Sequence, residues 1–106
     1  MKARRIRTGE SAMASRWRRR RMCVLIDERP APAALRHVSA TGAFLETNAR
    51  PAPGRSVELH HPEAGAIFAT VLSLAADGIA ISFECSERSV GFALAAIAAD
   101  MSQPAA

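Results

Sequence analysis

The chain has 106 residues, 49% hydrophobic and 23% charged, a composition typical of one small globular domain. No apolar run approaches the ~20 residues that span a bilayer, and no apolar stretch follows the basic start as it would in a secretory signal. Because two cysteines, Cys23 and Cys85, are too few for a disulfide framework, we expect a soluble cytoplasmic protein.

The net charge of +4 is unevenly distributed along the chain. Residues 1–21 carry nine basic residues against one acid, whereas residues 22–106 carry five arginines against nine acids. Nearly all the cations are arginines, whose planar guanidinium binds phosphate at two points and stacks on aromatic rings. The basic start therefore favours a nucleotide or nucleic-acid ligand, although a genome rich in G and C would also enrich arginine.

Residues 1–15 show no hydrophobic periodicity, and we predict a flexible basic arm there. Six short segments beyond it have alternating or branched apolar residues, which is typical of β-strands. In chain order these segments are residues 22–26, 34–38, 43–47, 55–60, 66–74 and 78–83.

Turn residues separate the predicted strands. Two prolines break the chain within residues 27–32. Residues 39–42 form a predicted turn in which Gly42 can adopt a positive φ. Asp77-Gly78 is typical of a tight hairpin. Strands at this spacing favour an antiparallel barrel.

Beyond Phe83 the apolar spacing changes to that of a helix, with Ser86 as a candidate N-cap. We interpret the apolar stripe on this helix as core packing or a helix interface; it comprises Val90, Leu94, Ile97 and Met101. The predicted fold class is mainly β, a six-stranded antiparallel barrel over residues 16–101 whose C-terminal helix covers one opening. Residues 102–106 are a predicted tail.

The arrangement resembles the PilZ domain family, whose members are six-stranded barrels that bind cyclic di-GMP. The family has two arginines separated by three residues just before the first strand, as Arg16 and Arg20 are here. At a later turn it has Asp or Asn, any residue, Ser, two residues and Gly. Ser39 and Gly42 match this second motif, and His37 stands at the Asp or Asn position. The resemblance covers roughly residues 16–101.

The resemblance implies a cyclic di-GMP site made of Arg16, Arg20, His37, Ser39 and Gly42. An arginine fork can meet O6 and N7 of guanine at two points, and Arg16 and Arg20 would clamp guanines and phosphates in this way. Ser39 would offer its hydroxyl, and Gly42 would allow close approach of the backbone. Neutral histidine has one acceptor nitrogen, so His37 predicts weaker binding than Asp or Asn, or stacking on a base.

Further phosphate contacts are expected from neighbouring arginines, of which Arg19 and Arg21 are candidates with Arg18. The predicted function is a regulatory module that orders its arm on binding cyclic di-GMP and then signals to a partner protein, as a monomer or homodimer. One alternative is a PilZ-like adaptor that has lost the ligand and acts through protein–protein contacts. A weaker alternative is a nucleic-acid binder with Trp17 for stacking.

We expect no enzymatic activity, no cofactor and no metal. Ser39 lies near His37, but no oriented acid or oxyanion element accompanies them. His60 and His61 are adjacent on a predicted strand and would point to opposite faces. The histidines and cysteines have no metal-ligand spacing.

Overall fold

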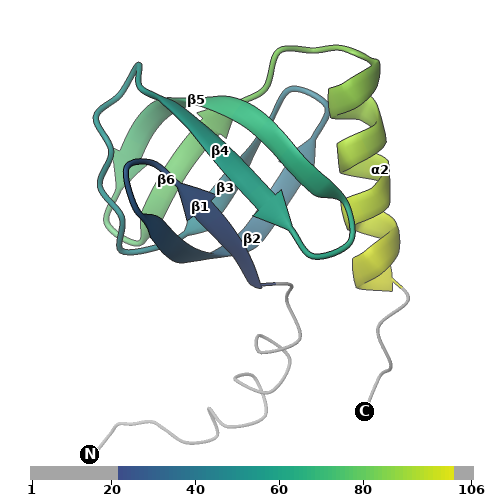
Figure 1. Ribbon diagram of the computed structural model, residues 1–106, viewed down its shortest axis with the longest axis horizontal. Coiled ribbons are helices and arrows are strands. Elements are labelled where there is room, and N and C mark those ends of the chain that lie inside the picture. Colours follow the sequence, from purple (N-terminus) through teal and green to yellow (C-terminus); the bar gives the residue numbers. More distant parts are fainter. Residues whose placement is uncertain (1–21, 102–106) are drawn as a thin grey trace, which may run out of the picture.

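The computed structural model describes residues 22–101. Six strands close into an antiparallel barrel in the order β1-β2-β3-β6-β5-β4, with one helix beside it (Figure 1). The fold class predicted from the sequence is confirmed. The elements are β1 (Met22–Ile26), β2 (Pro30–Ser39), β3 (Gly42–Glu46), β4 (Ser56–His61), β5 (Gly65–Ala75), β6 (Gly78–Ser82) and α2 (Glu87–Met101). The predicted arm and tail lie outside the described residues.

The second strand begins at Pro30, where the sequence predicted a break. Pro30 and Pro32 pair with β1, and the pairing of β2 with β3 begins only at Ala34. The carbonyl of Pro32 points to the β3 side, where it accepts a hydrogen bond of 2.8 Å from Thr47 Oγ1. In an antiparallel sheet the amide nitrogen and the carbonyl of one residue face the same neighbouring strand. The nitrogens of Pro30 and Pro32 therefore face the β3 side, where the pairing of β2 with β3 has not yet begun. Their missing N–H groups thus cost no ladder hydrogen bond.

The core fills the barrel with inward side chains of alternating strand positions. Leu25, Leu45, Leu59 and Ile79 are fully buried. Phe92 of α2 closes one end of this core and meets Phe83 edge-on, with the ring centroids 5.6 Å apart. The helix is therefore fastened to the barrel by an aromatic contact.

The apolar stripe predicted for the helix is not part of the buried core, so its interpretation as core is wrong, although Ile97 and Met101 border a cavity with Leu35 of β2. Its four residues are all exposed. The barrel side of α2 carries smaller residues around Phe92: Ser89, Ala93, Ala96 and Ala99. Alanines allow the helix backbone to lie close to the strands, and this close packing accounts for the face that is turned inward.

Ser86 caps the helix as predicted. Its Oγ accepts from the backbone N–H of Ser89 at 3.3 Å, and its own N–H donates to Ser89 Oγ at 2.9 Å. This reciprocal pair is a capping box in which a serine takes the place of the usual Glu or Gln. Two amide groups that the first turn leaves unpaired are thereby satisfied.

Candidate ligand-binding surface

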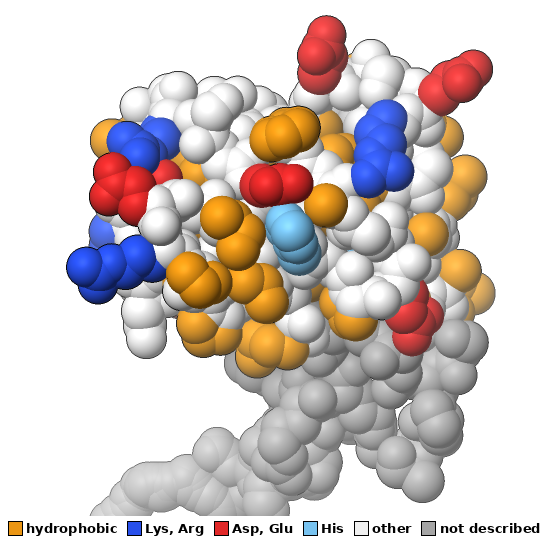
Figure 2. Space-filling view, in the orientation of Figure 1, with side chains coloured by type: hydrophobic (Ala, Val, Ile, Leu, Met, Phe, Trp, Pro, Cys, Tyr) orange, Lys and Arg blue, Asp and Glu red, His pale blue; other side chains and the backbone are white. Residues whose placement is uncertain are grey.

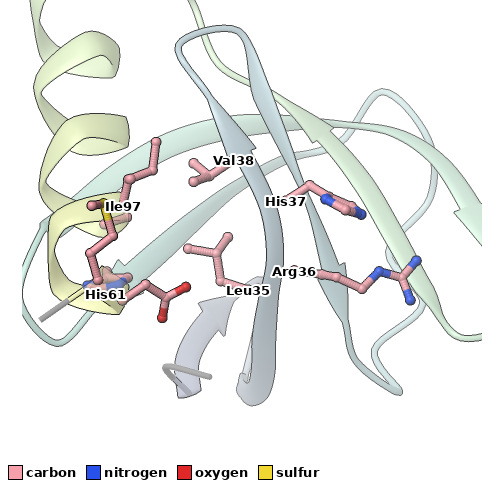
Figure 3. Close-up of a pocket in the computed structure, with 9 residues that line it drawn as sticks. Leu35, Arg36, His37, Val38, His61 and Ile97 are labelled. Atoms are coloured by element: carbon pink, nitrogen blue, oxygen red, sulfur yellow. The ribbon is translucent and has the colours of Figure 1, made fainter. Parts of the chain in front are cut away.

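A bulge in β2 sets the direction of the side chains in the candidate site. Leu35 pairs with Leu45 and His37 with Phe44, so the register between β2 and β3 skips Arg36. Simple alternation would place Arg36 and His37 on opposite faces. With the bulge both point away from α2, whereas Leu35 and Val38 point toward it (Figure 3).

Ser39 and Gly42 lie at the tip of the same hairpin. They pair with each other across the two-residue turn of Ala40 and Thr41. Ser39 Oγ accepts from the backbone N–H of Thr41 at 3.2 Å and lies 3.1 Å from Thr41 Oγ1. The structure therefore brings His37, Ser39 and Gly42 together, and Ser39 already stabilises the turn.

Gly42 has a structural reason to be glycine, but it is not the predicted one. Its φ lies outside the left-handed region, so the expectation of a positive φ is wrong. A Cβ at this position would instead lie far inside van der Waals contact with the carbonyl oxygen of Ile81. Gly42 pairs with Ser82 of β6, and these strands can approach so closely only because the residue at this position has no side chain.

An ion-pair cluster that sequence reasoning missed lies beside His37. Arg36 Nη1 donates to Glu46 Oε2 and to Asp77 Oδ2, each at 2.9 Å, and its guanidinium carbon is 4.1 Å from the centroid of the Phe44 ring. The hydrogen bond from Arg36 lowers the pKa of Asp77. The same bond, followed by that to Glu46, raises the pKa of Arg36. The sequence feature that could have indicated this arrangement is the pair of polar residues, Arg36 and His37, between the apolar Leu35 and Val38, because two adjacent polar residues interrupt the alternation of a regular strand.

A second arginine approaches the cluster from the connection after β3. Arg50 donates to the carbonyl oxygens of Ala75 and Ala76 in the β5–β6 turn, at 2.5 and 2.9 Å. The charges of Arg36 and Arg50 balance those of Glu46 and Asp77. The described part of this surface therefore has no excess positive charge for a phosphate ligand.

The basic residues predicted to bind phosphate precede the first described strand. Arg16, Arg19, Arg20 and Arg21 lie outside the described residues, and so does Trp17. Their point of attachment is described: Met22 begins β1 opposite Ala34 of β2. From there β2 continues for five residues to Ser39, a distance of about 16 Å along an extended strand.

A cavity of about 290 Å³ lies on the other side of β2, between its second half and the end of α2 (Figure 3). His61 lines it and is buried, whereas His60 is exposed, so the predicted opposite orientation of the two histidines is confirmed. His61 Nδ1 accepts backbone N–H groups of Glu63 and Ala64, each at 3.0 Å. Its ring also meets Phe92 edge-on at 5.9 Å between centroids. These contacts give His61 a structural role in the β4–β5 turn.

Comparison with known proteins adds no relative: no family model, no curated protein and no solved structure matches this chain. Within residues 22–101, no three His, Cys, Asp or Glu side chains gather as a metal site would require. The same part of the chain holds no helix of the length and hydrophobicity needed to cross a membrane.

Proposed function

We propose that this protein is a cyclic di-GMP-binding regulatory module without enzymatic activity. The observation that carries the proposal is the placement of His37, Ser39 and Gly42 on one hairpin of a closed six-stranded barrel, beside the strand that the basic residues enter. The ligand would lie against the outer surface of this hairpin. The arginines that precede β1 would hold its phosphates and guanines.

The charge balance of the surface supports a site in which the arginines before β1 bind the phosphates and the hairpin contacts the rest of the ligand. Arg36 and Arg50 are held by carboxylates and carbonyl oxygens, so neither offers a free guanidinium to a phosphate. A ligand with two phosphates therefore depends on Arg16 and Arg20 for its counter-charge. Arg16 is six residues from Met22, which allows a reach of about 20 Å and exceeds the length of β2 between Ala34 and Ser39, whereas Arg20 is two residues away and allows about 7 Å, toward the start of that segment.

A signalling step follows from this arrangement. A ligand that contacts both the basic segment and the barrel fixes one against the other. Only a ligand with different affinities for two states can shift their populations, and this bridging supplies that difference. A partner protein would bind the surface that the fixed basic segment and the barrel then form together.

The second candidate is an adaptor that acts through protein contacts without cyclic di-GMP. Specific observations favour it: the Ser39 hydroxyl is already used within its turn, and Gly42 is explained by strand packing. His37 also lacks the second acceptor that Asp or Asn would provide.

Calorimetric titration of the full chain with cyclic di-GMP tests the proposal. We expect saturable binding that is lost in both Arg16→Ala and Arg20→Ala. Arg29→Ala is the matched control, because it removes the same charge from an exposed loop at the far end of β2. Trp17, the single tryptophan, offers a second readout, since its fluorescence should change as the neighbouring arginines bind.

Three outcomes decide between the candidates. No heat at high ligand concentration contradicts the receptor proposal and favours the adaptor. An equal loss of affinity in Arg29→Ala would show that net charge alone drives binding, as for a general polyanion. Nucleic-acid binding that falls steeply with salt and needs most of the arginines would favour the third, weaker alternative.

A further inference from the structure

The helix α2 exposes most of its larger aliphatic side chains and buries mainly small residues around Phe92. Its larger aliphatic side chains lie mostly outside the core, and we call them the outer stripe: Val90, Leu94, Ile97 and Met101, which are 43%, 63%, 41% and 79% exposed. Ile97 and Met101 also border the cavity beside β2. Figure 2 shows hydrophobic side chains along the outer edge of the helix. A surface helix normally turns its apolar face to the core and its charged face to water.

No charge interrupts this outer face. Between Arg88 and Asp100 the sequence has no charged residue, and the only polar one, Ser89, is buried and bonded to Ser86. A contiguous exposed apolar surface of this kind marks an interaction site. Covering it would desolvate no charged group within these eleven residues.

The spacing of the outer stripe is that of a coiled-coil seam. Its members follow one another at intervals of four, three and four residues, the a and d positions of a heptad repeat. Gly91 lies beside this seam in the second turn of the helix, and a Cβ added there would meet nothing within 4 Å. Glycine disfavours a helix interior, but here it leaves room for another helix to approach closely.

We infer that the outer stripe is the contact surface of a homodimer in which two copies of α2 pack antiparallel. The four-three-four spacing reads the same in both directions, so Leu94 would face Ile97 of the partner subunit, and Val90 would face the partner's Met101. Such a surface is self-complementary, as a two-fold interface requires. This match is the reason that a second copy suits the stripe better than an unrelated protein.

Charge at the two ends of the helix selects the antiparallel orientation. A parallel pair would place Glu87 beside Glu87 of the partner subunit and Asp100 beside the partner's Asp100. The antiparallel pair separates each acid from its own counterpart and directs Asp100 toward the N-terminal end of the partner helix, where the helix dipole and Arg88 of the partner subunit favour a carboxylate beside the partner's Glu87. The dipoles of the two helices then also oppose each other.

The expected dimer is one that dissociates on dilution. A 15-residue helix is about 22 Å long, so one helix pair buries less than the standard interface of roughly 1,600 Å². Phe92 and the Ser86 cap already order the helix within each subunit, which reduces the entropic cost of association. Association needs no ligand and is therefore independent of the function proposed above.

Sedimentation equilibrium of the full chain over a wide concentration range, without nucleotide, tests this inference. We expect a reversible monomer–dimer equilibrium, and Leu94→Asp should be monomeric throughout. Leu72→Asp is the matched control, because Leu72 is 57% exposed on β5, outside the outer stripe. Thermal melts at low concentration establish that each variant is folded.

Disulfide formation tests the orientation in a Cys85→Ser background, where the remaining native thiol, Cys23, is buried. Mixed Leu94→Cys and Ile97→Cys proteins should form the heterodisulfide in preference to either homodisulfide. A chain that stays monomeric at every concentration overturns the inference. So does a dimer that persists in Leu94→Asp or is lost equally in Leu72→Asp, and a predominant Leu94→Cys homodisulfide overturns the antiparallel arrangement.

Discussion

Gly42 shows at the residue scale how a packing requirement can resemble a binding motif. Both the resemblance and the strand contact with Ile81 account for a glycine here. Loss of binding in a Gly42 variant would therefore not identify a ligand contact by itself. The stability of the variant has to be known first.

We predict that Gly42→Ala destabilises the barrel by about 1–3 kcal/mol, because the new methyl group forces β3 away from β6. Urea unfolding measures this change. Gly91→Ala is the control, since its Cβ enters open space in a helix and should stabilise by about 0.5–1 kcal/mol. Both are measured at low protein concentration. Equal stability of Gly42→Ala and wild type would contradict the close approach of the strands.

The two cysteines should differ sharply in reactivity. Cys23 is buried, and desolvation disfavours its thiolate and raises its pKa to about 11, whereas Cys85 is exposed. At pH 8 we expect one thiol of the native protein to react quickly with a disulfide reagent and the second only after denaturation. Cys85→Ser should abolish the fast phase, and a fast phase that remained would show that Cys23 is accessible.

At the scale of elements, the β2 bulge and the helix α2 each depart from simple periodicity. The bulge turns Arg36 and His37 to the same face, which alternation does not allow. The helix follows its predicted period but packs with the opposite side inward. Periodicity predicted the type of each element, whereas contacts with other strands decided its orientation.

The reversed helix leads to a stability prediction. Phe92→Ala should cost about 3–5 kcal/mol, because the ring is buried against Phe83 and His61 and its removal leaves a cavity. Leu94→Ala should change the stability of the monomer little, because that side chain is mostly exposed. Thermal or urea unfolding of both at low concentration measures the difference. A larger loss in Leu94→Ala would contradict the observed orientation of the helix.

At the scale of the whole molecule, closure of the barrel determines which surface a ligand could reach. The hairpin with His37 and Ser39 is adjacent to β1, and the basic sequence enters the fold at the start of that strand. Residues 1–21 carry a net positive charge and residues 22–106 a net negative charge. An anion that bridges the two would therefore be held mainly by the basic residues before β1 and oriented by the hairpin.

His37→Asp should strengthen cyclic di-GMP binding roughly tenfold if the site is placed correctly, because a carboxylate can accept two guanine N–H bonds and histidine only one. His60→Asp is the control, since that histidine is exposed on β4, and its affinity should equal that of wild type. Calorimetry compares the three proteins. Unchanged or weaker binding in His37→Asp would contradict the assignment of the second motif.

Local sequence determined the number of strands, their antiparallel class, the capped helix and the separation of charge, because alternation, turn residues and helical spacing are short-range properties. Tertiary structure decided what those rules cannot contain. It allowed Pro30 and Pro32 into β2 where no ladder bond to β3 is made, explained Gly42 by its approach to Ile81, paired Arg36 with Asp77 from a distant turn, and left the outer stripe exposed. Each of these depends on residues brought together only when the barrel closes.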